Sequence, residues 1–342
     1  MQPTDSISIG IVGAGAITRK SHLPVLVNTP NVTIAWIHDH RPETAKALAD
    51  AYGLKSVHTT APEQLPACDV ALLAIPVDGR GEYLRHFAAR GTAVFCEKPF
   101  ATSAAEHRNI LASFAPHALG AGFMRRFFQY ALLLRRIVKE RRFGPLYGID
   151  VSEGGRSKGS GADASFLDDP RFGASRGVLA DLGSHSVDLA LYVSAASGFD
   201  VRSCTRVMDG AVDRKVTAAV RLLGVASESA APIDMNYDVS WLDGQNNQIR
   251  LRFANATVWS GLGPASEVYI GDPAFPQDAM SLASEASRAV GATTYNQAFY
   301  LEWQHFLEGL RTHSESLISA RSALLTTSLV EALLTTAGSQ HD

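Results

Sequence analysis

Short apolar runs alternate with amphipathic segments along the first third of the chain. The runs are rich in β-branched and other apolar residues, as buried strands are. The segments between them carry the 3.6-residue apolar period of helices. The predicted strands are 7–12, 32–37, 70–75, 91–95 and 119–123, and the predicted helices include 42–52, 82–90 and one that starts at Ser103. This alternation predicts a doubly wound parallel sheet over residues 1–122.

The pattern changes after Arg125-Arg126, where a second domain is predicted over 123–342. Turn sequences at Asp209-Gly210 and Asp243-Gly244 separate strand-like runs, as an antiparallel sheet requires. The predicted elements are a helix over 128–142, a strand over 147–152, several strands over 201–259 and helices over 302–310 and 320–336. Together the two patterns predict an α/β protein of two domains.

Length and charge narrow the class of partner. A chain of 342 residues exceeds what one hydrophobic core usually supports, which agrees with two domains. Its 31 basic and 34 acidic residues give a net charge of −3, without the basic excess of nucleic-acid or anionic-membrane binders. No apolar run approaches the ~18 residues that a membrane span needs. We therefore expect a small-molecule partner, and neither nucleic acid nor membrane.

The cysteines and the N-terminal residues indicate the compartment. Cys68, Cys96 and Cys204 are odd in number and far apart, so neither a disulfide framework nor a metal site is predicted. Residues 1–6 lack the basic segment that begins a secretory signal. We expect a cytoplasmic protein with reduced thiols.

The first predicted strand ends at a glycine turn, which a helix follows. Gly13 permits a tight turn, and Gly15 lets backbone N–H groups approach a pyrophosphate at the positive end of the helix. Thr18 takes the third position, where Gly or Ala is usual, and we expect it to loosen the contact between helix and strand. The turn predicts dinucleotide binding by Gly13, Gly15, Ala16 and Ile17.

Asp39 follows the second predicted strand, 21 residues after Thr18. A carboxylate at this point accepts hydrogen bonds from both hydroxyls of an adenosine ribose and repels a 2′-phosphate, which favours NAD over NADP. Arg41 is a second candidate contact, because it could reach such a phosphate and permit both cofactors. The alternative is that Asp39 caps the helix that Pro42 opens.

The tetrapeptide Cys96-Glu97-Lys98-Pro99 puts an ammonium at the carboxyl end of a predicted parallel strand. Ligands of open α/β sheets bind outside these strand ends. Lys98 is therefore a candidate for catalysis and for substrate binding, and Glu97 and Lys98 are candidate cofactor contacts. The alternative is a solvated lysine where the strand ends.

Two further features lie in the second predicted domain. Residues 154–176 are rich in Gly and Ser and lack periodicity, which suggests a substrate-covering loop or else a mobile connection. Asp181, His185 and Asp188 are spaced i, i+4, i+7, so a helix would align them on one face. A carboxylate one turn before an imidazole can orient it and raise its basicity, as a general base needs. The alternative is a polar helix face with a structural histidine.

In their order and spacing, these segments resemble the glucose-fructose oxidoreductase, inositol dehydrogenase and rhizopine catabolism (Gfo/Idh/MocA) family. The resemblance spans most of the chain. It implies an N-terminal Rossmann domain, a C-terminal α/β domain with an open-faced, largely antiparallel sheet, and nicotinamide-dependent oxidation or reduction of a sugar or cyclitol. The segments that carry it are the Gly13/Gly15 turn with His22-Leu23-Pro24, Asp39, Glu97-Lys98-Pro99, Gly122-Phe123-Met124-Arg125-Arg126-Phe127 and 177–188.

The resemblance also implies roles for single residues. Lys98 falls on the family's catalytic lysine, and Asp181 and His185 fall on its catalytic acid/base pair, which would also contact the substrate. Two arginines are further candidates for substrate binding, Arg126 and Arg156.

Two positions depart from the family pattern. Arg176 stands where the family often has a further Gly, and Arg80 stands where it often has a His near the cofactor. Arg80 could bind an acidic group on substrate or cofactor, or point into solvent. We include it among the cofactor contacts predicted after the third strand, which are Ile75, Pro76 and Arg80.

The leading hypothesis is a dehydrogenase that moves hydride between a nicotinamide and a ring carbon of a polyol or keto-sugar. One alternative is a ketoreductase of a nucleotide-linked deoxysugar or another secondary-metabolite ketone. The other is a non-catalytic NAD(P)-binding regulator, against which the presence of Lys98, Asp181 and His185 argues. We also expect a homo-oligomer joined through the C-terminal sheet, because a sheet covered by helices on one side only leaves an apolar face.

Overall fold

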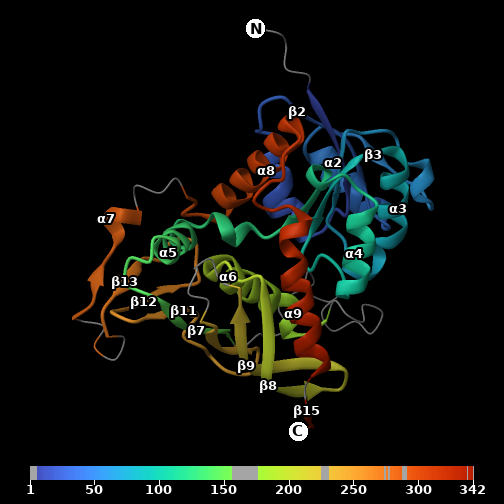
Figure 1. The fold of residues 1–342 in the computed structure, drawn as a ribbon. Helices are drawn as coiled ribbons and strands as arrows, with labels where there is room; N and C mark the ends of the chain where they lie inside the picture. Colours follow the sequence, from blue (N-terminus) through green and yellow to red (C-terminus); the bar gives the residue numbers. More distant parts are fainter. Residues whose placement is uncertain are drawn as a thin grey trace. The chain divides into compact units, whose positions relative to one another are not determined.

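The computed structural model describes residues 6–155, 176–224, 231–272, 275, 278–286, 291–336 and 338–341. The chain divides into two compact units (Figure 1). The first comprises Met1–Phe123 and Phe299–Leu324, and the second comprises Met124–Ala298 and Leu325–Asp342. The first unit thus includes a late segment that a single division at residues 122/123 assigns to the second domain. That division stays a prediction.

The first unit contains a six-stranded sheet in the order β3-β2-β1-β4-β5-β6, and every neighbouring pair is parallel. Since the strand order reverses between β1 and β4, the ligand crevice of such a fold lies at the carboxyl ends of these strands. The predicted doubly wound parallel sheet is confirmed. Its strands are β1 (Ile7–Val12), β2 (Val32–His38), β3 (Ser56–Val57), β4 (Val70–Leu73), β5 (Ala93–Glu97) and β6 (Leu119–Gly122).

Local signals set the helix ends in this unit. Gly91 adopts a φ of +68° directly after α3, a left-handed conformation that glycine reaches without strain. Ser103 caps α4, since its Oγ accepts a hydrogen bond from the Glu106 N–H at 3.1 Å. The α-helices that lie wholly within this unit are α1 (Leu23–Leu26), α2 (Pro42–Ala51), α3 (Gly81–Arg90) and α4 (Ala104–Ala112).

Helix α8 (Tyr295–Thr312) contributes aromatic side chains to the core of the first unit. The Trp303 ring stacks on Phe95 of β5 with centroids 4.5 Å apart, and Phe306 meets Phe95 edge-on at 5.4 Å. All three side chains are buried. Because truncation of a buried Phe or Trp to Ala costs about 3–5 kcal/mol, this cluster is a large part of what holds the late segment to the sheet.

The second unit contains a nine-stranded sheet in the order β14-β13-β12-β11-β7-β10-β9-β8-β15. All neighbouring pairs are antiparallel except β7 with β10 and β8 with β15, so the predicted, mainly antiparallel sheet is confirmed. The strands are β7 (Leu146–Gly154), β8 (Gly198–Asp209), β9 (Val212–Leu223), β10 (Ile233–Ser240), β11 (Gln248–Phe253), β12 (Thr257–Gly261), β13 (Val268–Ile270), β14 (Met280–Ser281) and β15 (Gly338–His341). The helices are α5 (Gln129–Lys139), α6 (Ser184–Ser194), α7 (Ala283–Ala286) and α9 (Leu324–Thr335).

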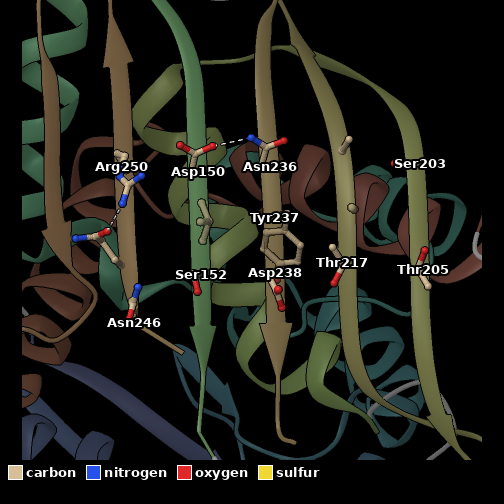
Figure 2. A pocket seen from close by; sticks show the side chains of 14 residues that line it. Asp150, Ser152, Ser203, Thr205, Thr217, Asn236, Tyr237, Asp238, Asn246 and Arg250 are labelled. Carbon is tan, nitrogen blue, oxygen red and sulfur yellow. Dashed lines mark hydrogen bonds between the residues drawn. The ribbon is translucent and has the colours of Figure 1, made fainter. Parts of the chain in front are cut away.

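One face of this sheet is lined by polar side chains. On β10, Met235 and Tyr237 are buried while Asn236 between them is exposed, as the two-residue period of a strand requires. Figure 2 shows Asn236 beside Asp150 of the neighbouring strand, where its Nδ2 donates to Asp150 Oδ1 at 2.7 Å. The prediction of an apolar uncovered face is therefore wrong for β10, because its outward positions carry polar residues. Oligomerisation itself stays a prediction.

Polar residues from five strands line a shallow groove of about 490 Å³ on this face (Figure 2). Arg250 donates to Gln248 Oε1 at 3.2 Å, and Arg252 lies 3.4 Å from Asp150 Oδ1. Donors and acceptors on this polar face therefore already pair with one another. No helix in the described part of the chain has the length and apolarity to cross a membrane.

Candidate active site

The glycine turn joins β1 to a short helical segment. Gly13 has a φ of +104°, and a Cβ there would lie 2.4 Å from the Ala74 carbonyl oxygen, so only glycine fits. A Cβ at Gly15 would meet no atom within 4 Å, which leaves space for a phosphate to approach the backbone. In this respect the turn fits a dinucleotide.

We predicted that Thr18 loosens the contact between helix and strand, but its side chain joins the two. Its side chain is fully buried, and its Oγ1 donates to the Gly13 carbonyl at 2.6 Å. The Thr18 hydroxyl thus joins the start of the helix to the end of the strand by a hydrogen bond, whereas Gly or Ala would let the two pack directly. Residues Thr18–His22 form a π-helical turn that continues into α1.

Asp39 is buried at the carboxyl end of β2. Its Oδ2 accepts the Ala14 N–H at 2.8 Å, and its Oδ1 accepts the Arg41 N–H at 2.9 Å. The carboxylate therefore links the glycine turn to the segment after β2. It caps no helix, because α2 begins after Arg41 and has no side-chain cap. The side chains of His40 and Arg41 are exposed beside it, with nitrogens 3.0 and 3.9 Å from Oδ1.

Arg80 is buried between the carboxyl ends of β4 and β5 and does not point into solvent. Its Nε donates to the Ile75 carbonyl at 2.8 Å. Its Nη1 donates to the carbonyls of Glu97 and Pro99, the latter at 2.6 Å. Burial lowers the pKa of Arg80 from its ordinary value, and nearby acidic groups offset only part of that effect.

Glu97 is buried at the end of β5 and belongs to a chain of hydrogen bonds. Trp303 Nε1 donates to His22 Nδ1 at 3.0 Å, so the proton of a neutral His22 ring lies on Nε2, which meets Glu97 Oε1 at 2.7 Å. Burial acts to raise the pKa of Glu97, but the His22 hydrogen bond and the Lys98 and Arg80 charges outweigh it and lower the pKa. Glu97 is therefore held as a carboxylate.

Lys98 follows this carboxylate at the carboxyl end of β5. Its N–H donates to Glu97 Oε2 at 3.0 Å, and the residue is half-buried. Lys98, Asp39, Arg80 and the Gly13 turn thus all follow carboxyl ends of strands in one sheet. This is the edge at which the sequence predicted a ligand.

Asp181 and His185 lie on one helical segment of the second unit, and both are half-buried. The segment starts as a π-helical turn, Leu179–Gly183, and continues as α6. Asp213 of β9 supports its start, since its Oδ2 accepts the Leu179 N–H at 2.9 Å. Burial raises the pKa of Asp213, against the lowering effect of this hydrogen bond.

Asp188 has different surroundings from this pair. It is 1% exposed and forms a bidentate ion pair with Arg126, with distances of 2.8 and 2.5 Å. It also accepts a hydrogen bond from Thr326 Oγ1 at 2.9 Å. The one-face prediction assumed a regular α-helix, whereas the structure begins this segment with a π turn.

Arg126 is 4% exposed, and its guanidinium is paired with Asp188. Arg156 lies outside the described residues. Ile75 and Pro76 are half-buried next to Arg80, and Ile17 is exposed beside the glycine turn. Each predicted contact role stays a prediction.

Several supporting residues were not singled out from the sequence. Trp303 acts on His22 from 281 positions away, a separation at which no periodic signal exists. Arg125 and Glu153 form a buried bidentate pair at 3.0 and 2.7 Å. No cluster of three or more metal-binding side chains occurs within the described ranges. Cys68, Cys96 and Cys204 are free thiols, and burial raises the pKa of Cys96 to about 12.

Residues 7–119 match the model of an oxidoreductase family with an NAD-binding Rossmann fold. This segment is a Gfo/Idh/MocA Rossmann domain. The family resemblance seen in the sequence is thereby confirmed, and with it the prediction of a nicotinamide dinucleotide as cofactor. The turn with its open space above Gly15 and the buried Asp39 fit that cofactor.

Two curated relatives extend the comparison beyond residues 7–119. It is 25% identical over 205 residues to the inositol 2-dehydrogenase of Rhizobium meliloti, which covers 59% of each chain. It is 27% identical over 188 residues to the glucose-6-phosphate 3-dehydrogenase of Bacillus subtilis, which covers 54% of this chain and 53% of that one. The matches thus span little more than half the length of these relatives.

A solved structure shows that the whole fold is shared. KijD10, a 3-ketoreductase from Actinomadura kijaniata in complex with NADP and TDP-benzene, superposes with a TM-score of 0.79. The match covers 99% of this chain and 100% of that one, at 16% sequence identity. At this identity the likeness concerns the fold alone.

Proposed function

We propose that the protein transfers hydride between a nicotinamide cofactor and a hydroxyl or keto carbon of a sugar or cyclitol. The observation that carries this proposal is Lys98 at the carboxyl end of β5 in a matched NAD-binding domain. The relatives named inositol 2-dehydrogenase and glucose-6-phosphate 3-dehydrogenase support this substrate class. When bound, the nicotinamide would supply the hydride acceptor or donor.

The remaining chemistry falls to side chains. For oxidation of an alcohol, His185 would remove the hydroxyl proton, and Asp181 would orient the ring and stabilise its positive charge. Lys98 would hold the hydroxyl oxygen and stabilise its developing negative charge. The reverse assignment, with Lys98 as the base and His185 as the hydrogen-bond donor, uses the same residues. Both assignments require these residues to act on the same substrate.

Cofactor contacts follow from the first unit. Backbone N–H groups near Gly13 and Gly15 would face the pyrophosphate, and Asp39 would face the adenosine ribose. The charge of Asp39 favours NAD, whereas the exposed Arg41 side chain offers positive charge to a 2′-phosphate. NAD is therefore the expected main cofactor, with NADP as a second substrate.

The ketoreductase of a nucleotide-linked deoxysugar is the second candidate. Its support is the shared fold of KijD10, whose structure contains TDP-benzene and NADP. Such an enzyme would run the same hydride transfer in the reducing direction, with protonation of the carbonyl oxygen in place of deprotonation. A non-catalytic regulator remains the third alternative and would show binding without turnover.

A screen with polyols and sugars tests this function. Purified protein is mixed with each compound and NAD⁺ or NADP⁺, and formation of reduced nicotinamide is followed by absorbance. Oxidation of at least one sugar or cyclitol, abolished in Lys98→Ala, supports the proposal. Turnover of only nucleotide-linked keto-sugars with reduced cofactor would instead favour the ketoreductase, and cofactor binding with no turnover would favour the regulator.

We further propose a cytoplasmic homo-oligomer that associates through the nine-stranded sheet. Because the face around Asp150, Asn236 and Arg250 is polar, such an association would depend on ionic pairs and hydrogen bonds. Charge pairs weaken as salt screens them. Sedimentation velocity should therefore show an oligomer at low salt that dissociates in part at high salt, and a monomer at micromolar protein and low salt would rule it out.

A further inference from the structure

Arg80 is a buried cation whose hydrogen bonds all go to backbone carbonyls. It is 2% exposed, and it reaches the carbonyls of Ile75, Glu97 and Pro99. Two of these carbonyls belong to the residues immediately before and after Lys98. One guanidinium therefore binds the backbone on both sides of Lys98, the residue proposed to contact the substrate.

The backbone around Lys98 is held from a second direction as well. The Lys98 N–H donates to Glu97 Oε2 at 3.0 Å, and the other oxygen of Glu97 meets His22 at 2.7 Å. The Ile75 carbonyl lies beyond the end of β4, so Arg80 also ties the Lys98 segment to the neighbouring strand. These bonds fix residue 98 relative to two strand ends.

A buried guanidinium is a poor device for stability alone. Removing it from water is costly, and apolar residues of similar volume often stabilise such sites as well or better. The hydrogen bonds of the Arg80 side chain go to backbone carbonyls and not to a carboxylate. The Glu97 carboxylate acts on Arg80 only through its charge. The planar guanidinium instead fixes the positions of the backbone carbonyls that it binds, because its N–H donors have fixed relative angles.

We propose that Arg80 is a positioning residue that fixes the backbone on both sides of Lys98 and thereby aims the Lys98 ammonium at the substrate. This role rests on the proposed function, in which Lys98 binds the reacting oxygen. It removes Arg80 from the set of direct cofactor or substrate contacts. A lysine could keep the charge but could not bridge the Glu97 and Pro99 carbonyls with a planar fork.

Arg80→Lys tests the kinetic part, with Arg85→Lys as its matched control. Arg85 lies on the adjoining helix α3 with its side chain 77% exposed, and it pairs only weakly with Glu82 at 3.9 Å. Misplacement of a catalytic group by about 1 Å can cost about 10²-fold in rate, so kcat of Arg80→Lys should fall by about that factor. Its dissociation constant for NADH should stay near the wild-type value, its melting temperature should fall because a buried carbonyl loses its donor, and Arg85→Lys should match the wild type throughout.

Lys98 itself provides a readout that needs no substrate. The chain has seven lysines, and reductive methylation with ¹³C-formaldehyde gives each a methyl signal in NMR spectra. The Lys98 signal is the one missing in Lys98→Arg. We expect it to shift or broaden in Arg80→Lys and to stay in place in Arg85→Lys.

A second variant separates local positioning from general damage. Arg80→Ala leaves room for a free guanidinium ion, and addition of guanidinium at non-denaturing concentration should restore part of kcat and move the Lys98 signal back. An Arg80→Lys protein with wild-type kcat and an unmoved Lys98 signal would overturn the proposal. If no substrate is ever turned over, the proposed function fails, and the Lys98 signal alone still decides the role of Arg80.

Discussion

At the scale of single residues, substitution of His185 has a large expected kinetic effect. Oxidation of a secondary alcohol needs a group that removes the hydroxyl proton, because an unassisted alkoxide is far too basic near neutral pH. Loss of a positioned proton acceptor costs ~10²–10⁴ in rate, so we expect His185→Ala to lower kcat by that order. Steady-state kinetics measure kcat, and NADH fluorescence should show cofactor binding retained. Near wild-type kcat at every pH would return this histidine to a structural role.

Asp39 has two functions in the first unit, and one substitution separates them. Its Oδ2 accepts the Ala14 N–H, while its charge would repel a 2′-phosphate. Asp39→Asn keeps an acceptor for Ala14 but removes the charge. We expect the ratio of kcat/KM for NADP⁺ to that for NAD⁺ to rise about tenfold, which is about 1.4 kcal/mol.

Asp39→Ala is the control for this measurement. It removes both the charge and the acceptor, so it should change the cofactor ratio in the same direction and also lower the melting temperature. A wild-type protein that uses both cofactors with equal kcat/KM would show that Asp39 is not the selector.

At the scale of elements, α8 is joined to β5 by ring stacking and to the π-helical turn Thr18–His22 by one hydrogen bond. Trp303→Phe keeps a ring against Phe95 but removes the donor to His22 Nδ1. A buried polar atom left without its partner costs about 1–3 kcal/mol, and we expect the free energy of unfolding to fall by that amount. Urea titration measures the loss, and ¹⁵N NMR of His22 should show that its proton is no longer confined to Nε2.

A double-mutant cycle assigns this loss to the hydrogen bond. With His22→Phe as the second variant, the two substitutions should not add, because either one already removes the Trp303–His22 bond. Additive losses would mean that Trp303 acts through ring packing alone.

The elements themselves were largely predictable, since short-range rules set them. Gly91 and Ser103 mark helix ends through local backbone and side-chain chemistry, and both signals are visible within four residues of sequence. The π turns at Thr18–His22 and Leu179–Gly183 were not predictable, because an inserted residue in a helix leaves no periodic trace. For this reason the structure does not have the regular α-helix from which the alignment of Asp181, His185 and Asp188 on one face was predicted.

At the scale of the whole molecule, pH should act on stability through His107. Burial lowers the pKa of this histidine from 6.5 to about 4, although its ring donates to the Ala320 carbonyl at 2.9 Å. As the pH falls through this window, the unfolded chain binds the proton first. Stability contributed by neutral His107 is therefore present above pH 6.5 and is lost as the pH falls towards 4, by up to about 1.4 kcal/mol per pH unit.

His107→Gln should flatten this dependence. Glutamine can still donate to the Ala320 carbonyl but does not titrate in this range. Free energies of unfolding measured by urea titration near pH 6.5 and near pH 4 should differ less in the variant than in the wild type. Equal differences in both proteins would assign the acid sensitivity to other groups.

Long-range contacts set the limit of what the sequence could predict. The parallel sheet of the first unit and the position of Lys98 at the carboxyl end of a strand follow from local patterns and were predicted, whereas the strand order was not. Arg80 was noticed only as a departure, because its three carbonyl partners lie in other segments. The polar face around Asn236 was missed because alternation fixes which residues share a face, but not which face the helices cover.

The division of the first unit between Met1–Phe123 and Phe299–Leu324 has a consequence during synthesis on the ribosome. The parallel strands emerge early, but Trp303 and Phe306, which pack against Phe95, emerge only after most of the second unit has been made. The second unit likewise waits for Leu325–Asp342. Neither unit can complete its core before these late helices have left the exit tunnel. The nascent chain therefore carries the exposed Phe95 ring while the second unit is being made, and chaperones that shield such surface should raise its yield.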